Sequence, residues 1–148
     1  MKSLGEYTVK GRVAHLEETR IILFDGRTDT GFVVKSFQIF PYDFSAATDQ
    51  TILGRLATTD GLPVVRERFW DASDNRQVAW ASTDGLGFES MNPGQFTAID
   101  PDNFIVEDLF ITCLNGDDNE SNYLIVLEKY DTTESHGALA MVRNRSQA

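Results

Sequence analysis

The residues best suited to binding a metal ion are the acids of one short segment, LNGDDNES at 114–121. Asp117, Asp118 and Glu120 offer carboxylate oxygens, which are the ligands that Ca²⁺ prefers. Their order does not follow an EF-hand loop, in which ligands alternate around a central glycine. Asn-Gly and Asp residues are also typical of a hairpin tip without a metal. We therefore expect a hairpin tip whose acids face solvent or a neighbouring subunit, with calcium binding as the alternative.

Two further acids, Glu107 and Asp108, are adjacent within the apolar segment 104–114. Neighbouring side chains of a strand point to opposite faces, so these two cannot act as one acid–base pair. A carboxylate among apolar residues needs a cationic partner. Arg66 and Arg68 of VVRERFW share one face of an expected strand, and a guanidinium group binds a carboxylate bidentately. The pattern predicts a structural ion pair or a subunit contact.

The chain shows no sequence motif of a catalytic site. His15 and His136 are the two histidines, and neither has another His or a Cys at metal-ligand spacing. No G-x-S-x-G motif marks a nucleophilic serine. The one cysteine, Cys113, lies in an apolar strand, where a thiol is usually inert. We expect no enzymatic activity and no cofactor.

Aromatic residues provide an alternative from another functional class. Side chains that could form a platform for sugar rings are Trp70, Trp80, Tyr42, Phe88 and Phe96. Such residues are also ordinary core and interface material. A calcium-assisted carbohydrate-binding sandwich therefore stays open as a second interpretation.

The charge of the chain is negative and unevenly distributed. The 148 residues carry a formal net charge of −10, and no Lys or Arg lies between Arg76 and Lys129. Nucleic-acid binding needs clustered cations that neutralise phosphates, so we expect no nucleic-acid partner. Like charge on the surface keeps a protein soluble, and an acidic face that meets cations or a basic partner is the alternative.

Length and composition indicate one soluble domain over residues 1–148. A chain of this size can bury a sufficient core without disulfides, and a single cysteine cannot form an internal bridge. The N-terminal MKSLGEYTVKGRV lacks the apolar stretch of a secretion signal, and no apolar run approaches the length of a bilayer span. We expect synthesis in a cytoplasm and no membrane association.

Short segments rich in β-branched and aromatic residues alternate with Asp-Gly and Asn-Gly pairs, which readily form hairpin turns. The expected strands span 19–24, 31–40, 50–58, 63–70, 76–82, 104–114 and 123–127. The first two are expected to form a hairpin around Asp25-Gly26, and residues 1–20 an N-terminal arm or edge strand. This spacing predicts a mainly β fold, a single-domain antiparallel β-sandwich or jelly-roll-like barrel.

Segments 104–114 and 123–127 are apolar on both strand faces. Such strands are covered on both sides, by a second sheet, a helix or another subunit. One helix is expected at 131–147, where Asp131 and Glu134 form a plausible capping box. A short helix of this kind, in a C-terminal tail over 131–148, is typical of a docking element.

Three segments carry a family resemblance: ILFDGRTDTGFVVKSFQI, DPDNFIVEDLFITC and NYLIVLEKYDTTESHGALAMVRNRSQ. Their most recognisable points are Asp25-Gly26, Asp100-Pro101-Asp102 and Arg143-Asn144-Arg145-Ser146. With these segments the chain resembles small virion-associated proteins of marine tailed bacteriophages. The similarity is one of overall pattern over most of the length, and it is least over 41–95.

The resemblance implies a non-enzymatic structural protein of the virion. A capsid decoration or cement protein that binds the major capsid protein and copies of itself is the expected role, so a homo-oligomer is expected. A head–tail connector, adaptor or fibre component is the nearest alternative. In the C-terminal helix, Met141 and Val142 share one face, and Arg143 and Arg145 could reach the acidic half of an adjacent copy. Deleting residues 131–148 should then leave the fold intact but abolish assembly.

Overall fold

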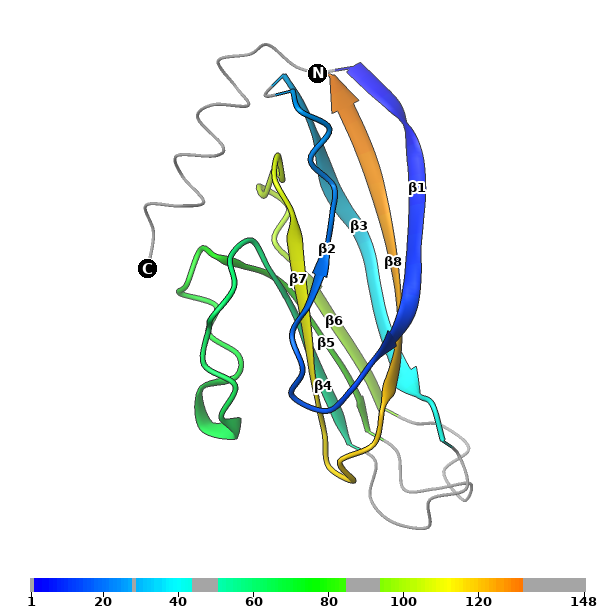
Figure 1. Cartoon of the computed structure of the whole chain (residues 1–148), viewed down its shortest axis with the longest axis vertical. Coiled ribbons are helices and arrows are strands. Elements are labelled where there is room, and N and C mark those ends of the chain that lie inside the picture. Colours follow the sequence, from blue (N-terminus) through cyan, green and yellow to red (C-terminus); the bar gives the residue numbers. More distant parts are fainter. Residues whose placement is uncertain (1, 28, 44–50, 85–93, 132–148) are drawn as a thin grey trace.

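The computed structural model describes residues 2–27, 29–43, 51–84 and 94–131 (Figure 1). Within these ranges the elements, in chain order, are β1 (Lys2–Val13), β2 (Thr19–Ile21), β3 (Thr30–Pro41), β4 (Ile52–Ala57), the 3₁₀ helix η1 (Arg66–Arg68), β5 (Gln77–Asp84), β6 (Gly94–Ile99), β7 (Leu109–Asn115) and β8 (Ser121–Asp131).

These strands form two antiparallel sheets that pack face to face, which confirms the predicted mainly β sandwich. One sheet has the order β1-β8-β3, and the other has the order β2-β7-β4-β5-β6 (Figure 1). β1 pairs with β8, β2 with β7 and β4 with β5, while β3 and β4 lie beside β8 and β7. This order and pairing of strands is that of a jelly roll with one exception. In a jelly roll β6 would pair with β3, whereas here it is hydrogen-bonded to β5.

Threonine side chains join the free edge of β3 to the five-stranded sheet. Thr83 Oγ1 of β5 donates to the carbonyl of Ile39 at 2.5 Å. Thr97 Oγ1 of β6 donates to the carbonyl of Phe37 at 3.1 Å. These two bonds satisfy main-chain acceptors that a β3–β6 ladder would otherwise use, so the sandwich is closed on this side.

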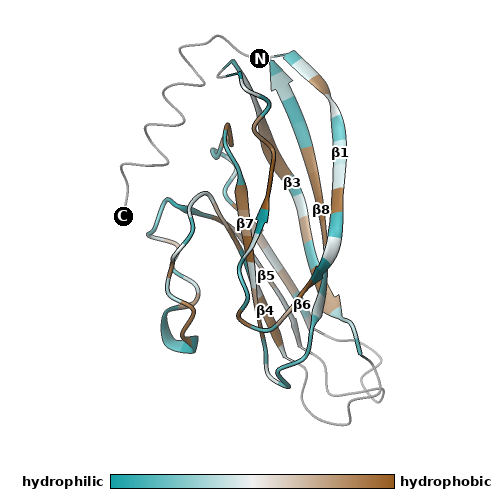
Figure 2. Ribbon diagram, viewed as in Figure 1, coloured by the Kyte–Doolittle hydropathy of each residue, from teal (hydrophilic) through white to brown (hydrophobic). Residues whose placement is uncertain are grey.

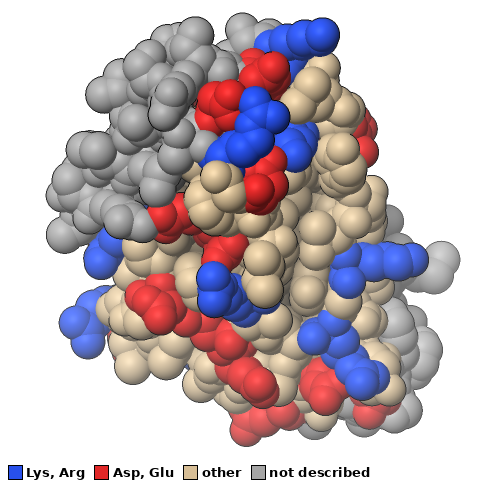
Figure 3. All heavy atoms as spheres, turned by 45° about the horizontal axis from the view of Figure 1, so that its top comes forward, with Lys and Arg blue, Asp and Glu red and all other residues tan. Residues whose placement is uncertain are grey.

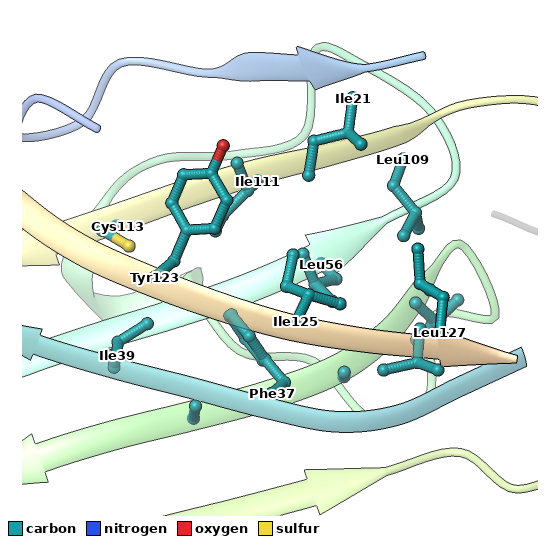
Figure 4. Packing of buried hydrophobic residues seen from close by; sticks show 14 of the residues in the cluster. Ile21, Phe37, Ile39, Leu56, Leu109, Ile111, Cys113, Tyr123, Ile125 and Leu127 are labelled. Carbon is teal, nitrogen blue, oxygen red and sulfur yellow. The ribbon is translucent and has the colours of Figure 1, made fainter. Parts of the chain in front are cut away.

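The hydrophobic core lies between the sheets (Figure 4). Alternate residues of β3 and β8 point inward from one sheet, and alternate residues of β4 and β7 point inward from the other. The labelled members are Ile21, Phe37, Ile39, Leu56, Leu109, Ile111, Cys113, Tyr123, Ile125 and Leu127. Burial alternates with period two along β8, as in a half-buried strand, whereas β4 and β7 are buried at most positions.

Two predicted hairpins are instead connections between the sheets. Segment 19–24 contributes β2 to the five-stranded sheet, whereas segment 31–40 lies in β3 of the other sheet. The segment 114–121 likewise links β7 to β8, which belong to different sheets. Gly26 has the positive φ expected of a turn residue, whereas in the second loop the positive φ is at Asp118 instead of Gly116. Local turn chemistry does not determine which sheet the next strand joins.

The predicted strand at 63–70 is wrong. In the structure this segment is irregular and contains only η1. Its main-chain carbonyls turn inward toward a buried arginine of β4, Arg55, so they are not available to a strand ladder. The segment lies on the outer face of the five-stranded sheet and buries Leu62 and Phe69 there.

The prediction of strands covered on both faces holds for β7. Its inward residues are fully buried, and on the outer face Thr112 and Leu114 are also buried. In β8 the outward residues Leu124 and Val126 are only half-buried, so that face of the three-stranded sheet is partly exposed.

The N-terminal segment forms β1, an edge strand (Figure 1). Much of β1 is hydrophilic or neutral, whereas hydrophobic residues concentrate on the inner strands of each sheet (Figure 2). At the other end, Asp131 is the last residue of β8, opposite Thr30 and Lys2. The remainder of the helix predicted at 131–147 lies outside the described residues, and so do Met141, Val142, Arg143 and Arg145.

Gly31 lies where β3 packs closely against the residues that precede β7. A Cβ atom at this position would lie 2.5 Å from two ring carbons of Phe104 and 2.8 Å from the carbonyl oxygen of Ile105. The next residue, Phe32, exchanges two backbone hydrogen bonds of 2.8 Å with Ile105. A side chain at position 31 would push Phe104 and Ile105 away from β3.

Gly31→Ala is therefore expected to lower the free energy of unfolding by about 2 kcal/mol through overpacking. Urea unfolding at one fixed protein concentration measures the change. Gln38→Ala, at an exposed position of the same strand, is the control and should change stability by less than about 0.5 kcal/mol. Equal effects of the two substitutions would contradict the close packing at Gly31.

Candidate functional site

The acidic loop between β7 and β8 packs against the end of β1 and the residues that follow it. Glu120 forms an ion pair with Arg12 at 2.5 Å. Asp118 Oδ1 lies 3.1 Å from Nε2 of His15, whose Nδ1 accepts a hydrogen bond from the Asn115 amide at 2.9 Å. The loop thus meets basic side chains of its own chain, which ties the two sheets together at this end.

Asp117 lies in the same loop, and its amide donates to the side-chain oxygen of Asn115 at 2.9 Å. Among the residues that the structure describes, no group of three or more His, Cys, Asp or Glu side chains is arranged to hold a metal ion. The candidate calcium ligands therefore do not converge on one point in the described part of the chain.

The predicted pairing of Glu107 and Asp108 with Arg66 and Arg68 is wrong for Asp108. Asp108 is buried and accepts a hydrogen bond of 2.6 Å from Nε of Arg20, with which it also forms an ion pair. Both acids precede β7, so the expectation that they point to opposite faces of one strand does not apply. Arg66 and Arg68 lie exposed on η1.

Asp108 also fixes the chain after β2. Its Oδ1 accepts hydrogen bonds from the amides of Leu23 at 3.1 Å and Phe24 at 3.4 Å. Burial opposes ionisation of this carboxyl, but the hydrogen bonds from Arg20 and the two amides outweigh it, so the pKa of Asp108 lies below the ordinary Asp value. The carboxylate is a structural anchor for the β2–β3 connection.

Sequence analysis missed Arg55, which is 1% exposed in the middle of β4. Its Nη1 donates to the Phe69 carbonyl at 3.0 Å and also to the Pro63 carbonyl, and its Nη2 donates to the Leu62 carbonyl at 3.1 Å. Its guanidinium carbon lies 4.6 Å from the centre of the Phe69 ring. The sequence signal that could have indicated this site is an arginine among the apolar residues of the predicted strand 50–58.

Two acidic residues, Glu18 and Asp74, offset the positive charge of Arg55 through their electric fields. Burial lowers its pKa, whereas the fields of Glu18 and Asp74 raise it. Burial raises the pKa of Glu18, while a hydrogen bond from the Gly61 amide lowers it. Because an arginine in a protein stays protonated, this group is a fixed cation that holds the 62–69 segment against the sheet.

The proposed aromatic platform is only partly assembled. Trp70 and Phe96 lie with ring centres 5.8 Å apart, and Phe96 is 50% exposed. The Trp80 indole donates to Gln77 at 2.8 Å. Tyr42 lies elsewhere, beneath the guanidinium of Arg12. Phe88 falls outside the described residues.

Cys113 is fully buried in the core, and burial raises the pKa of its thiol to about 12. The thiol therefore stays protonated and poorly nucleophilic at neutral pH, as expected for a packing residue.

The charge asymmetry of the sequence does not become a single acidic face in the view of Figure 3. Blue cations and red anions lie interspersed over this side of the molecule. Ion pairs between residues far apart in the sequence also bring opposite charges together, such as Lys129 with Asp25 at 3.0 Å and Lys35 with Glu128 at 3.2 Å.

The outer edge of β1 is a candidate binding surface of the described structure. β1 pairs with β8 along one side, and no described strand pairs with its other side (Figure 1). All residues from Lys2 to Thr8 are exposed. An unpaired strand edge presents a row of amide donors and carbonyl acceptors that can bind another strand.

No family model matches this chain, and no curated protein or solved structure gives a significant match. Within the described residues, none of the helical structure is both long and apolar enough to cross a membrane.

Proposed function

We propose that the chain is a non-enzymatic structural protein of a bacteriophage virion, a capsid decoration or cement protein that binds the major capsid protein and copies of itself. The observation that carries the proposal is the open edge of β1, on a sandwich in which the buried side chains of Asp108 and Arg55 already have structural partners. Asp108 and Arg55 are held by the chain's own donors and acceptors. These features therefore support strand pairing at the β1 edge better than they support a catalytic site.

Two further points support this role. The jelly-roll wrapping occurs in viral capsid domains, although a fold by itself does not specify a function. The resemblance of three segments to virion-associated phage proteins points to the same class. A connector, adaptor or fibre component would use the same kinds of surface, so the copy number distinguishes it from a decoration protein.

Quantitative mass spectrometry of purified virions tests the proposal. The chain should be present at a copy number comparable to that of the major capsid protein. The purified chain should also bind saturably to shells prepared without it, as measured by co-sedimentation. Absence of the chain from virions would overturn the proposal, and a few copies at one vertex would favour the connector or fibre alternative.

The Trp70–Phe96 contact favours one second candidate, carbohydrate binding. Jelly rolls also include lectins, and exposed aromatic rings bind sugar faces. A glycan array screened with the wild-type chain and with Phe96→Ala tests this candidate, with Tyr42→Ala as the matched control on the other sheet. Glycan binding that is lost only in Phe96→Ala, together with no binding to shells, would replace the structural proposal.

A further inference from the structure

The exposed half of β1 contains a segment that is complementary to itself when read in the opposite direction. The segment is Gly5-Glu6-Tyr7-Thr8-Val9-Lys10-Gly11. An antiparallel pair of two copies related by a two-fold axis at Thr8 places each residue i opposite residue 16 − i of the partner. Glu6 then faces Lys10, Tyr7 faces Val9, Gly5 faces Gly11, and Thr8 faces itself.

We propose that two copies of this chain dimerise edge to edge through β1 in this register, joining their three-stranded sheets into one six-stranded sheet. The inference rests on the proposed function, because it names the surface and the partner for the self-association part of it. A closed two-fold interface of this type uses the same patch on both copies.

The backbone geometry supports pairing along this edge. β1 is 12 residues long, which exceeds the usual strand length and gives room for a continuous ladder. An antiparallel ladder forms close to one hydrogen bond for each paired residue. The opposite edge of the same sheet is different, because carbonyls of β3 there already accept hydrogen bonds from Thr83 and Thr97.

The side chains on the outer face supply opposite charges in the required places. Glu6 lies opposite Glu128 of β8, whereas Lys10 lies opposite Leu124. Neither Glu6 nor Lys10 has an ion pair within the described part of the chain. Charged residues on an edge strand normally discourage pairing. In this register they instead form two symmetric opposite-charge pairs.

The inward face supplies an apolar contact. Tyr7 lies opposite the buried Leu127 within the monomer, yet its side chain is 50% exposed. Its ring makes an edge contact with Phe32, with the centres 6.2 Å apart, so its position is fixed before association. The partner's Val9 would cover the exposed part of Tyr7. An aromatic ring opposite a β-branched residue is a favourable cross-strand pair.

Charge reversal followed by rescue tests the register. Glu6→Lys and Lys10→Glu should each weaken the dimer by about tenfold or more in sedimentation equilibrium at low salt, because each places like charges opposite each other twice. The double variant Glu6→Lys/Lys10→Glu should restore wild-type dimerisation. An equimolar mixture of the two single variants should form heterodimers more tightly than either variant forms homodimers.

The matched control is Glu67→Lys, an equal charge change at an exposed position on η1, away from β1 (Figure 1); it should leave dimerisation unchanged. Loss of dimer in Glu6→Lys cannot come from unfolding if its circular dichroism and melting temperature are retained. We expect them to be retained because the substitution removes a like-charge neighbour of Glu128.

Cross-linking tests the axis directly. Thr8→Cys should form an intermolecular disulfide under mild oxidation, because the two positions 8 face each other. Lys10→Cys should not, because the two positions 10 lie roughly 14 Å apart in this register, beyond disulfide reach. The native thiol, Cys113, is buried and gives a low background.

A wild-type chain that is monomeric at 100-fold above the concentration used for shell binding would overturn the inference, and so would a dimer that is insensitive to both single charge variants. Shell binding tests the proposed function separately. A monomer that still binds shells refutes only the β1 dimer, whereas a β1 dimer that is absent from virions refutes only the virion role. Loss of shell binding in the single variants of a monomeric chain would assign the edge to a capsid strand instead of a second copy.

Discussion

Arg55→Met is expected to lower the free energy of unfolding by about 3 kcal/mol, the largest effect of any single substitution considered for this protein. Methionine keeps the length and much of the packing against Phe69 but donates no hydrogen bonds. The carbonyls of Leu62, Pro63 and Phe69 would lose a shared donor in a region where Leu62 and Phe69 are buried. Buried acceptors without donors are the reason for the cost.

Urea unfolding measures the change, and in a Trp80→Phe background the fluorescence of Trp70 reports on the 62–69 segment locally. The Trp70 indole donates to the Gly54 carbonyl at 3.1 Å, so detachment of the segment exposes this residue. Arg55→Lys should recover only part of the loss, because an ammonium group lacks the planar set of donors that reaches several carbonyls. Arg68→Met, at an exposed position on η1, is the control, expected within about 0.5 kcal/mol of wild type. Similar losses in Arg55→Met and Arg68→Met would rule out the buried carbonyl site.

Asp108→Ala is expected to lower the free energy of unfolding by about 2 kcal/mol. The substitution removes the acceptor for Arg20 Nε and for the amides of Leu23 and Phe24, so the connection from β2 to β3 loses its anchor. Asp108→Asn keeps one side-chain oxygen and should lose about half as much. Chemical denaturation at pH 7 gives both values. Glu67→Gln, at an exposed site, is the control and should be neutral.

The same carboxyl gives a defined pH dependence. Because the pKa of Asp108 is lower in the folded chain than the unfolded value of about 3.9, its contribution is fully present above that value. The contribution is lost as the pH falls below about 4 and through the folded pKa. The stability difference between wild type and Asp108→Asn should therefore shrink in this acid range and stay constant from pH 5 to 7. A difference that stays constant down to pH 2 would contradict the anchoring role of the carboxylate.

The local pattern of the sequence determined the fold class and much of the strand content. Alternation of apolar and polar residues is a property of neighbouring positions, so it predicted the segments that became β3, β4, β5, β7 and β8. It also predicted that β7 is covered on both faces, because Thr112 and Leu114 lie among apolar residues on the side away from the core. The N-terminal segment was expected to be an arm or an edge strand, and in the structure it forms the edge strand β1.

Tertiary structure alone decided which strands pair and which charges meet. The chain reverses near Asp25-Gly26 and after Asn115-Gly116. After a reversal the next strand can join either the same sheet or the other sheet. In both places it joins the other sheet, where its apolar face packs against the first sheet. Asp108 found Arg20, which is 88 positions away, instead of the arginines of VVRERFW. The VVRERFW segment itself does not form a strand, because main-chain carbonyls in and next to it accept hydrogen bonds from Arg55. Partners of buried charges are chosen by three-dimensional proximity and desolvation, which spacing along the chain does not encode.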